Sequence, residues 1–127
     1  MKPKERESDI LRTISEGLSA LRIWHMRCNS GAMFGEYAGK KRMLRFGRRG
    51  MADVLALPRI CEAGHINCTD GDKPHCGPTV FWLEIKRPGE KQSPDQIAFE
   101  QEVTAEGHRY LVAHSWEDVR AALTMSK

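Results

Sequence analysis

The sequence predicts a single α/β domain built around a small mixed sheet, and three patterns lead to that class. Apolar residues at helical spacing occupy 5–21, two short apolar runs at 52–57 and 79–86 have the composition of strands, and a capped helix precedes a strand at 109–113. The 127 residues match the length of one ordinary domain with one hydrophobic core. We therefore expect one domain over 1–127.

The first helix is expected from about Glu5 to Leu21. Its apolar positions follow the three-and-four spacing of a stripe that faces the core: Ile10, Leu11, Ile14, Leu18 and Leu21. Gly17 weakens this prediction without overturning it, because glycine costs a helix interior conformational entropy. A strand near Ile23 to Cys28 follows, with Cys28 expected as an ordinary buried strand residue.

The middle of the chain predicts turns and short strands. Asn29-Ser30-Gly31 is typical of a turn, and a short strand is expected at Met43 to Phe46. Ala52 to Leu57, closed by Pro58, has the composition of a central strand that carries one charge, Asp53. Residues 59–78 are expected to form a loop-like insert rich in Cys and His.

The second half predicts a strand, a helix, a strand and a helix. Thr79 to Lys86 alternates, so that Glu84 and Lys86 share one face with Val80 and Trp82. Ser93 as N-cap, Pro94 at the first helical position and Gln96 in capping-box register open a helix that ends at Gly107. A strand at 109–113 and a helix at 116–123 complete the order α-β-β-β-α-β-α.

Composition argues against a membrane protein and against a secreted one. No apolar run approaches the ~20 residues that cross a bilayer. The N-terminus, Met-Lys-Pro-Lys-Glu-Arg-Glu, lacks the apolar core of a signal peptide. We therefore expect no membrane partner and a cytoplasmic, reducing compartment.

The net charge of +3 is unevenly distributed. Six basic residues and no acidic ones lie in the segment 40–49: Lys40, Lys41, Arg42, Arg45, Arg48 and Arg49. Such a local field attracts polyanions, which favours nucleic acid as a partner. The alternative is a solvated loop that charge keeps soluble.

Three charged residues on the apolar strands need an explanation, because an unpaired buried charge is costly. Glu84 and Lys86 project to the same face about 7 Å apart, and Asp53 joins them if the two strands are neighbours. Two carboxylates suit Mg²⁺ or Mn²⁺, and a lysine can stabilise charge that develops on a phosphate. The alternative is an exposed Glu84–Lys86 ion pair, with Asp53 starting a turn after Gly50.

The ordered set Asp…Glu-x-Lys on adjacent strands resembles the PD-(D/E)xK nuclease superfamily. More narrowly, the chain resembles the VRR-NUC domain, a small nuclease of DNA replication and repair that also occurs alone in phages and bacteria. Four segments carry the resemblance: 27–31 (Arg-Cys-Asn-Ser-Gly), 46–53 (Phe-Gly-Arg-Arg-Gly-Met-Ala-Asp), 81–88 (Phe-Trp-Leu-Glu-Ile-Lys-Arg-Pro) and 93–99 (Ser-Pro-Asp-Gln-Ile-Ala-Phe). Ala52 replaces the family's usual proline, and the resemblance does not extend to 59–78.

This resemblance implies a restriction-endonuclease-like αβββαβ core with a small mixed sheet and a C-terminal helix. It implies that Asp53, Glu84 and the carbonyl of Ile85 bind Mg²⁺ or Mn²⁺, and that Lys86 is the catalytic lysine. Gln96 would orient the lysine or a water molecule. Its capping-box role is an equally good explanation, and one amide can serve both only in part.

The family also has a glutamate on its first helix, and Glu5, Glu7 and Asp9 are the candidates here. Glu7 is chosen because it lies three residues before Ile10, on the stripe that faces the core. The alternative is a first-turn carboxylate favoured by the helix dipole.

The insert at 59–78 offers five ligands of the kind that structural zinc uses: Cys61, His65, Cys68, His75 and Cys76. Their spacing is irregular, and adjacent His and Cys residues seldom reach the same ion. A structural Zn²⁺ and a loosely packed loop with free thiols both remain open.

The expected function is therefore a metal-dependent DNA endonuclease that hydrolyses phosphodiester bonds. The resemblance implies selectivity for branched DNA such as Holliday junctions, and a homodimer, because cutting two opposed strands needs two sites. The basic residues of 40–49, together with Lys91, would contact the DNA backbone of a branched or duplex substrate. Two alternatives are a non-catalytic nucleic-acid-binding module with a zinc-bound insert, and a degenerate nuclease fold used in assembly.

Overall fold

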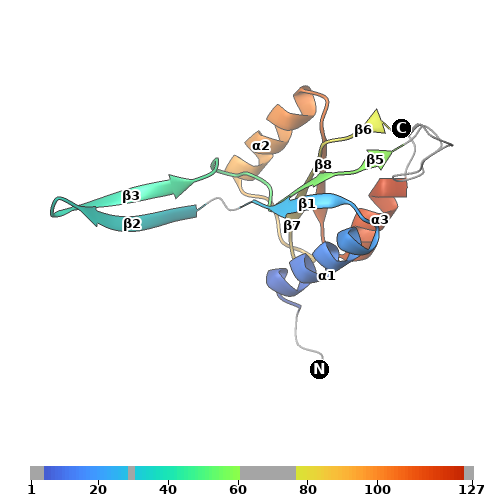
Figure 1. The fold of residues 1–127 in the computed structure, drawn as a ribbon, viewed down its shortest axis with the longest axis horizontal. Helices are drawn as coiled ribbons and strands as arrows, with labels where there is room; N and C mark the ends of the chain where they lie inside the picture. The colour runs from blue at the N-terminus through green and yellow to red at the C-terminus, as the bar shows by residue number, and fades with distance from the viewer. Residues whose placement is uncertain (1–4, 29–30, 61–76, 125–127) are drawn as a thin grey trace.

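A four-stranded mixed sheet forms the centre of the computed structural model, which describes residues 5–28, 31–60 and 77–124 (Figure 1). The strand order is β1-β4-β7-β8. The β1–β4 and β4–β7 pairs are antiparallel, whereas β7 and β8 run parallel. The bounds are β1 Trp24–Arg27, β4 Val54–Leu57, β7 Phe81–Ile85 and β8 Arg109–Ala113. The chain is thus of the mixed α/β class.

Helices cover both faces of this sheet (Figure 1). Helices α1 (Glu7–Ala20) and α3 (Trp116–Thr124) pack on the face to which Phe81, Leu83 and Ile85 point. Helix α2 (Pro94–Ala105) lies on the opposite face, where Phe99 makes an edge-to-face contact with Trp82 at 5.0 Å between ring centroids. Since α2 crosses between the parallel strands β7 and β8, the order of these elements follows from the sheet topology.

The helices and strands predicted for the core are confirmed, and most of their ends lie within one or two residues of the predicted ends. Helix α1 buries Ile10, Ile14 and Leu18, as the stripe predicts. The alternation in β7 is also confirmed, with one exception of consequence: Glu84 is buried together with the apolar face. Strand β4 begins at Val54, so Asp53 directly precedes the strand and is not part of it. Cys28 follows β1 and is only half-buried, contrary to expectation.

Gly17 has a packing role that its helix propensity hides. A Cβ atom built there would lie 2.5 Å from the ring of Trp116, so α1 and α3 approach closely at this point. We expect Gly17→Ala to lower the melting temperature by several degrees, although the same change in an open helix is stabilising by up to about 1 kcal/mol. Thermal unfolding measures this, with Ser19→Ala on the same helix as the control. A higher melting temperature for Gly17→Ala would contradict the predicted clash.

A long hairpin, β2 (Gly31–Tyr37) with β3 (Lys40–Phe46), corrects the expectation for this region. Only a short strand at 43–46 was expected, and Gly31, expected in a turn, begins a strand; residues 29–30 lie outside the described residues. The two-residue loop Ala38-Gly39 has φ values of 54° and 75°, which is the backbone of a type I′ hairpin turn. Such a turn is usually signalled by Asn-Gly or Asp-Gly, and so Ala-Gly did not indicate it.

The insert begins and ends in a short antiparallel pair. Strands β5 (Arg59–Ile60) and β6 (Gly77–Pro78) replace the loop expected at the ends of 59–78. The five candidate zinc ligands lie outside the described residues: Cys61, His65, Cys68, His75 and Cys76. Among the residues that the structure describes, no three His, Cys, Asp or Glu side chains come together in a way that could hold a metal ion. In the same part of the chain, no helix has both the length and the apolar character needed to cross a membrane.

Candidate active site

Strand register brings Asp53 and Glu84 together. The β4–β7 ladder pairs Val54 with Leu83 and Leu55 with Trp82, so the next position places Asp53 opposite Glu84. Side chains of directly opposed residues share a face of the sheet. The Asp53 carbonyl accepts a hydrogen bond from the Cys28 amide at 2.7 Å, which fixes the backbone of Asp53 against the chain that leaves β1.

Both carboxyl groups are held in place by neighbouring donors. The Asp53 Oδ2 atom accepts a hydrogen bond from the amide of Ile85 at 2.7 Å. The Glu84 Oε1 atom accepts one from Gln96 Nε2 at 2.9 Å. Each acid thus has one oxygen engaged by a fixed donor from another element.

The second oxygen of Glu84 has a different environment. Glu84 is 2% exposed, and its Oε2 atom is buried without a hydrogen-bond donor in the described part of the chain. The Asp53 carboxyl lies within hydrogen-bonding reach of the Glu84 carboxyl, a contact that is favourable only when one of the acids is protonated. A buried carboxylate oxygen beside a second carboxylate is an environment that a divalent cation fits, because a cation would satisfy both.

Electrostatics at Glu84 agree with this geometry. Burial, followed by the charge of Asp53 and the hydrogen bond with it, raises the pKa of Glu84 to about 8, and the Lys86 ammonium opposes this shift. The alternative of an exposed Glu84–Lys86 ion pair is contradicted, since Glu84 is buried and none of the ion pairs among the described residues joins the two.

Lys86 follows β7 directly and is half-buried. Its amide donates to the Ala113 carbonyl at 3.0 Å, and its carbonyl accepts from His114 Nδ1 at 3.1 Å. A carbonyl cannot donate, so His114 must carry a proton on Nδ1. His114 was not among the candidates from the sequence; it positions the Lys86 backbone from the end of β8.

Gln96 performs two roles at once. Its side-chain Oε1 atom accepts a hydrogen bond from the Ser93 backbone amide at 2.8 Å. The Gln96 backbone amide donates to Ser93 Oγ at 3.2 Å, which completes the predicted capping box. Its Nε2 atom meanwhile donates to Glu84. The side-chain amide therefore caps α2 with its oxygen and binds Glu84 with its nitrogen. That Gln96 orients the lysine or a water molecule, in part alongside its capping role, stays a prediction.

Of the three candidate acids, Glu5 precedes α1, whereas Glu7 and Asp9 lie in its first turn and have different surroundings. Asp9 accepts from the Arg6 amide at 3.2 Å and pairs with Arg12, and so it belongs to the helix N-terminus. Glu7 is exposed, contrary to its expected place on the core-facing stripe, because the stripe reaches solvent at the first turn. Partial desolvation and the Glu90 carboxylate raise the pKa of Glu7, while Lys86 lowers it and Asp53 raises it. Glu7 is therefore an acid whose charge interacts with both Lys86 and Asp53.

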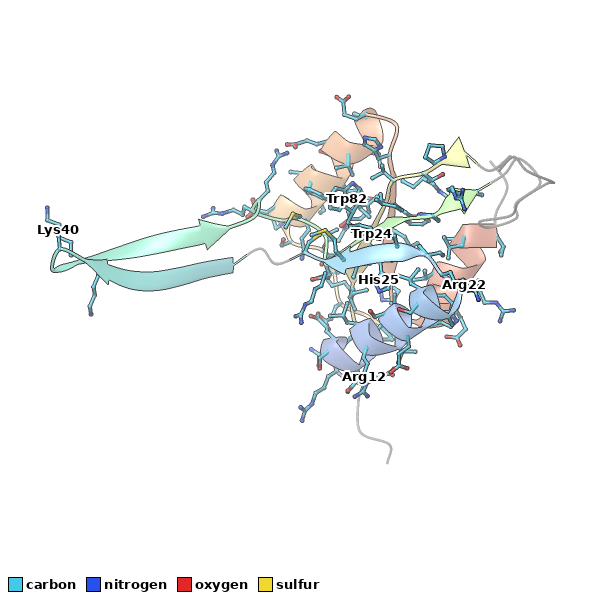
Figure 2. The ribbon with its side chains drawn as sticks, in the orientation of Figure 1. Arg12, Arg22, Trp24, His25, Lys40 and Trp82 are labelled. Atoms are coloured by element: carbon cyan, nitrogen blue, oxygen red, sulfur yellow. The ribbon has the colours of Figure 1, made fainter. Side chains whose placement is uncertain are left out.

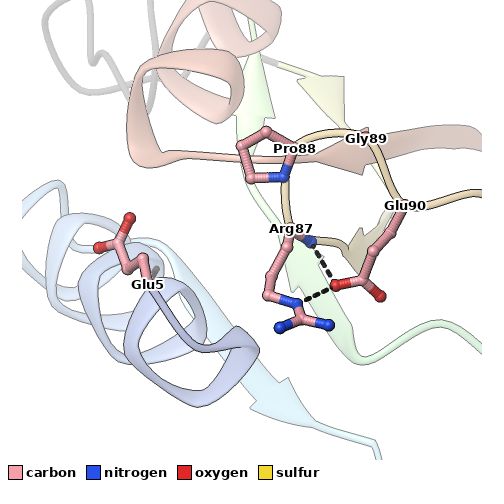
Figure 3. A pocket seen from close by; sticks show the side chains of 5 residues that line it. All are labelled: Glu5, Arg87, Pro88, Gly89 and Glu90. Carbon is pink, nitrogen blue, oxygen red and sulfur yellow. Dashed lines mark hydrogen bonds and ion pairs between the residues drawn. The ribbon is translucent and has the colours of Figure 1, made fainter. Parts of the chain in front are cut away.

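The charges of Glu90 and Arg87 interact with that of Glu7, and neither residue was predicted from the sequence. Arg87, Pro88, Gly89 and Glu90, together with Glu5, line a hollow of about 540 Å³ (Figure 3). Glu90 accepts hydrogen bonds from the amide and the guanidinium of Arg87, and this bonding lowers the pKa of Glu90.

A turn brings Glu90 back beside Arg87. The Glu90 amide donates to the Arg87 carbonyl at 3.0 Å, and Gly89 has a φ of 88°, the geometry of a type II turn after Pro88. The turn itself is expected from Pro88-Gly89 in the sequence and is confirmed, and the opposite charges that flank it were the signal that could have identified the Arg87–Glu90 pair.

Gly50 links the loop before Asp53 to helix α2. Its φ is 78°, and a Cβ atom there would lie 2.2 Å from the Asp95 carbonyl oxygen and 2.8 Å from the Gln96 nitrogen. The loop can therefore approach the first turn of α2 only because residue 50 has no side chain. This contact ties Asp53 to the helix that carries Gln96.

We expect Gly50→Ala to weaken divalent-metal binding at least about tenfold and to lower the melting temperature, since the α2 backbone must move away. Calorimetric titration with Mn²⁺ and thermal unfolding measure the two effects. Gly107→Ala is the matched control, because Gly107 has a φ of 86° at the end of the same helix and no atom within 4 Å of its Cβ position. Equal effects of the two substitutions would show that backbone strain, and not the contact with α2, is responsible.

The basic residues predicted to contact DNA fall into two groups. Arg48 pairs with Glu102, and Arg49 lies 4.0 Å from Asp95, so both arginines contact acids of α2. These pairs are exposed and worth at most about 1 kcal/mol each, so an anionic ligand could replace them. Three lysines are exposed: Lys40, Lys41 and Lys91. The structure describes the backbone of Arg42 and Arg45 but not their side chains.

Comparison with known proteins adds no assignment to this geometry. No protein-family model matches the chain. Nor does any curated protein match it. The functional conclusion therefore depends on the residues themselves.

Proposed function

We propose that this chain is a divalent-metal-dependent nuclease that hydrolyses phosphodiester bonds in DNA. The observation that carries the proposal is the pairing of Asp53 and Glu84 across β4 and β7, with Glu84 Oε2 buried beside a second carboxylate and without a donor. Lys86 follows Glu84 at the spacing of one face of the strand. Hydrolysis of a phosphodiester is among the slowest reactions in water. A pair of acids that can bind a metal ion, with a lysine next to it, suits the attack of water on such a bond.

The residues that would hold Mg²⁺ or Mn²⁺ are Asp53 and Glu84, with the Ile85 carbonyl as the third protein ligand. Such an ion would supply Lewis acidity toward a phosphate oxygen and toward water. Gln96 keeps one Glu84 oxygen in place, and Oε2, which is buried without a donor in the described part of the chain, would be the oxygen that binds the ion. Asp53 is similarly oriented by the Ile85 amide. Preorganised ligands of this kind need no reordering when the metal binds.

Lys86 would act on the substrate. The charge of its ammonium acts on Glu84, and there it would neutralise the negative charge that grows on the phosphate as the new bond forms. The charge of Glu7, in the first turn of α1, interacts with that of Lys86, and Glu7 would orient the ammonium or a water molecule. Arg87 pairs with Glu90, and the charges of both interact with Glu7, so Arg87 would bind a neighbouring phosphate if that anion displaced Glu90.

The topology is a second support for the proposal. Helix α1 precedes three consecutive strands of the sheet, β1, β4 and β7, and α2 then crosses to the parallel strand β8. This is the order implied by the resemblance to VRR-NUC domains, with the αβββαβ core of restriction-endonuclease-like proteins. We therefore extend the proposal to branched DNA as the substrate and to a homodimer that presents two sites to opposed strands.

Cleavage of a labelled four-way junction tests the proposal. The wild type should nick the junction with Mg²⁺ or Mn²⁺ and should be inactive in EDTA. Asp53→Ala should bind the junction as tightly as the wild type and cut it at least about 100-fold more slowly. Binding by the wild type without nicking in Mn²⁺ would instead favour a non-catalytic nucleic-acid-binding module, whose zinc would be found by elemental analysis of the purified protein.

A further inference from the structure

The β2–β3 hairpin begins and ends beside the candidate active site. The Cys28 amide, just before the hairpin, donates to the carbonyl of Asp53. On its other side, the hairpin returns through Gly50, which packs on the first turn of α2. A ligand bound to the hairpin would therefore extend from the reacting centre.

The hairpin also lacks the support that the other strands have. In the described part of the chain, β2 and β3 pair only with each other, and Figure 1 shows them extending away from the sheet and its helices. Two-stranded hairpins are marginally stable in water unless another surface covers them. The hairpin is thus shaped to gain stability from a ligand.

Charge indicates which ligand fits. The hairpin strands contain four basic residues, Lys40, Lys41, Arg42 and Arg45, against the single acid Glu36. The net charge of the two hairpin strands is therefore +3, which equals the net charge of the entire chain, so the rest of the sequence is neutral overall. Figure 2 shows Lys40 at the outer end of the hairpin, and Lys41 beside it is also exposed. The positive field therefore projects from the molecule, which favours a polyanion as the occupant.

We propose that this hairpin lies along a groove of duplex DNA, on one side of the bond to be cut. The inference rests on the proposed function and specifies its substrate. The major groove of B-DNA admits a two-stranded β-ribbon. Seven residues per strand extend about 24 Å at ~3.4 Å per residue, which matches about seven base pairs at the same rise. The substrate therefore needs a duplex arm of at least about seven base pairs beside the cleavage site.

Two hairpin variants test this. One replaces residues 35–42 with Asn-Gly, which shortens the ribbon and keeps a two-residue turn. The other is Lys40→Ala/Lys41→Ala, which removes two charges at the outer end. The matched control is Arg12→Ala/Arg120→Ala, which removes the same charge from exposed residues on α1 and α3.

Binding is measured by fluorescence anisotropy in EDTA, on DNA stem-loops with stems shorter and longer than about seven base pairs. The wild type should bind long stems at least about tenfold more tightly than short ones, and the shortened hairpin should lose this difference. For Lys40→Ala/Lys41→Ala, the slope of log K against log salt should become shallower by about 1.8, since each phosphate contact contributes about 0.9. The control should keep the slope of the wild type.

Equal affinity for short and long stems, or equal affinity for single strands, would overturn the inference. So would a shortened hairpin that changes the protein from dimer to monomer in sedimentation and leaves DNA binding per protomer unaltered, because the hairpin would then be an interface between copies. Thermal stabilisation by Mn²⁺ verifies that each variant keeps its folded metal site.

The proposed function can fail separately from this inference, since binding in EDTA requires no cleavage. A wild type that never nicks DNA in Mn²⁺ would contradict the nuclease proposal and leave the hairpin proposal standing. A wild type that nicks DNA, with hairpin variants that bind and cut as well as it does, would sink the hairpin proposal alone.

Discussion

Lys86→Ala is expected to slow metal-dependent DNA cleavage by about 100- to 1,000-fold while leaving junction binding within about threefold of the wild type. Lys86 is half-buried, and the charge of its ammonium acts on both Glu84 and Glu7. Charge that develops on the phosphate in the transition state would lose its nearest protein counter-charge. The ground-state complex, held by exposed cations elsewhere, would lose little.

Single-turnover cleavage of a labelled junction measures this effect, with binding measured separately in EDTA. Lys91→Ala is the matched control, because it removes the same charge from an exposed position a few residues further along the chain. It should reduce binding slightly and leave the single-turnover rate of bound DNA unchanged. If Lys86→Ala and Lys91→Ala change that rate equally, Lys86 has no special role and the assignment fails.

Glu84→Gln is expected to stabilise the metal-free protein and to abolish its stabilisation by Mn²⁺. Glu84 is 2% exposed and its carboxyl meets that of Asp53, so the ionised form is held at a cost in the folded state. A glutamine would keep the acceptor for Gln96 Nε2 and would present an amide donor to Asp53 in place of a second negative charge. The same exchange removes a ligand from the proposed metal site.

The pH dependence follows from the raised pKa of Glu84, about 8 in the folded chain against 4.5 for an unperturbed glutamate. A carboxyl whose pKa is raised on folding contributes fully to stability below pH 4.5. This contribution declines as pH rises from 4.5 toward 8, because the unfolded chain releases the proton more readily. The metal-free wild type should therefore lose stability over this interval by an amount on the order of a few kcal/mol.

Thermal unfolding between pH 5 and pH 9 tests this, with and without Mn²⁺. The gap in melting temperature between Glu84→Gln and the wild type should widen with pH in EDTA, and Mn²⁺ should narrow or reverse it by stabilising only the wild type. Glu16→Gln, at an exposed position of α1, should show no such gap. A destabilised Glu84→Gln at high pH would contradict the description of the site.

Sequence alone identified the elements whose signals are local. The capping box of Ser93 and Gln96 set the start of α2, and the alternation of 79–86 located β7, because both patterns depend on neighbours in the chain. The hairpin was missed for the complementary reason. Its strands pair with each other and extend away from the central sheet (Figure 1), and the turn Ala38-Gly39 lacks the usual residues.

The candidate site, like the fold, has features that were predicted from the sequence and features that were not. The types and spacing of Asp53, Glu84 and Lys86 pointed to one chemistry, and the sequence also supplied Gln96 as a capping residue. Which groups surround them could not be read from the chain, since Glu90 and His114 reach Glu7 and Lys86 through turns and strand ends that only folding brings close.

The sequence by itself therefore determined the α/β class and the starts of α2 and α3, and it selected Asp53, Glu84 and Lys86 as candidates, because these depend on residue type and local period. The tertiary structure decided that Asp53 stands opposite Glu84, that one amide caps a helix and binds an acid, and that a positively charged hairpin extends beside them. The physical reason is register: a shift of one residue between β4 and β7 would point the two carboxylates to opposite faces of the sheet.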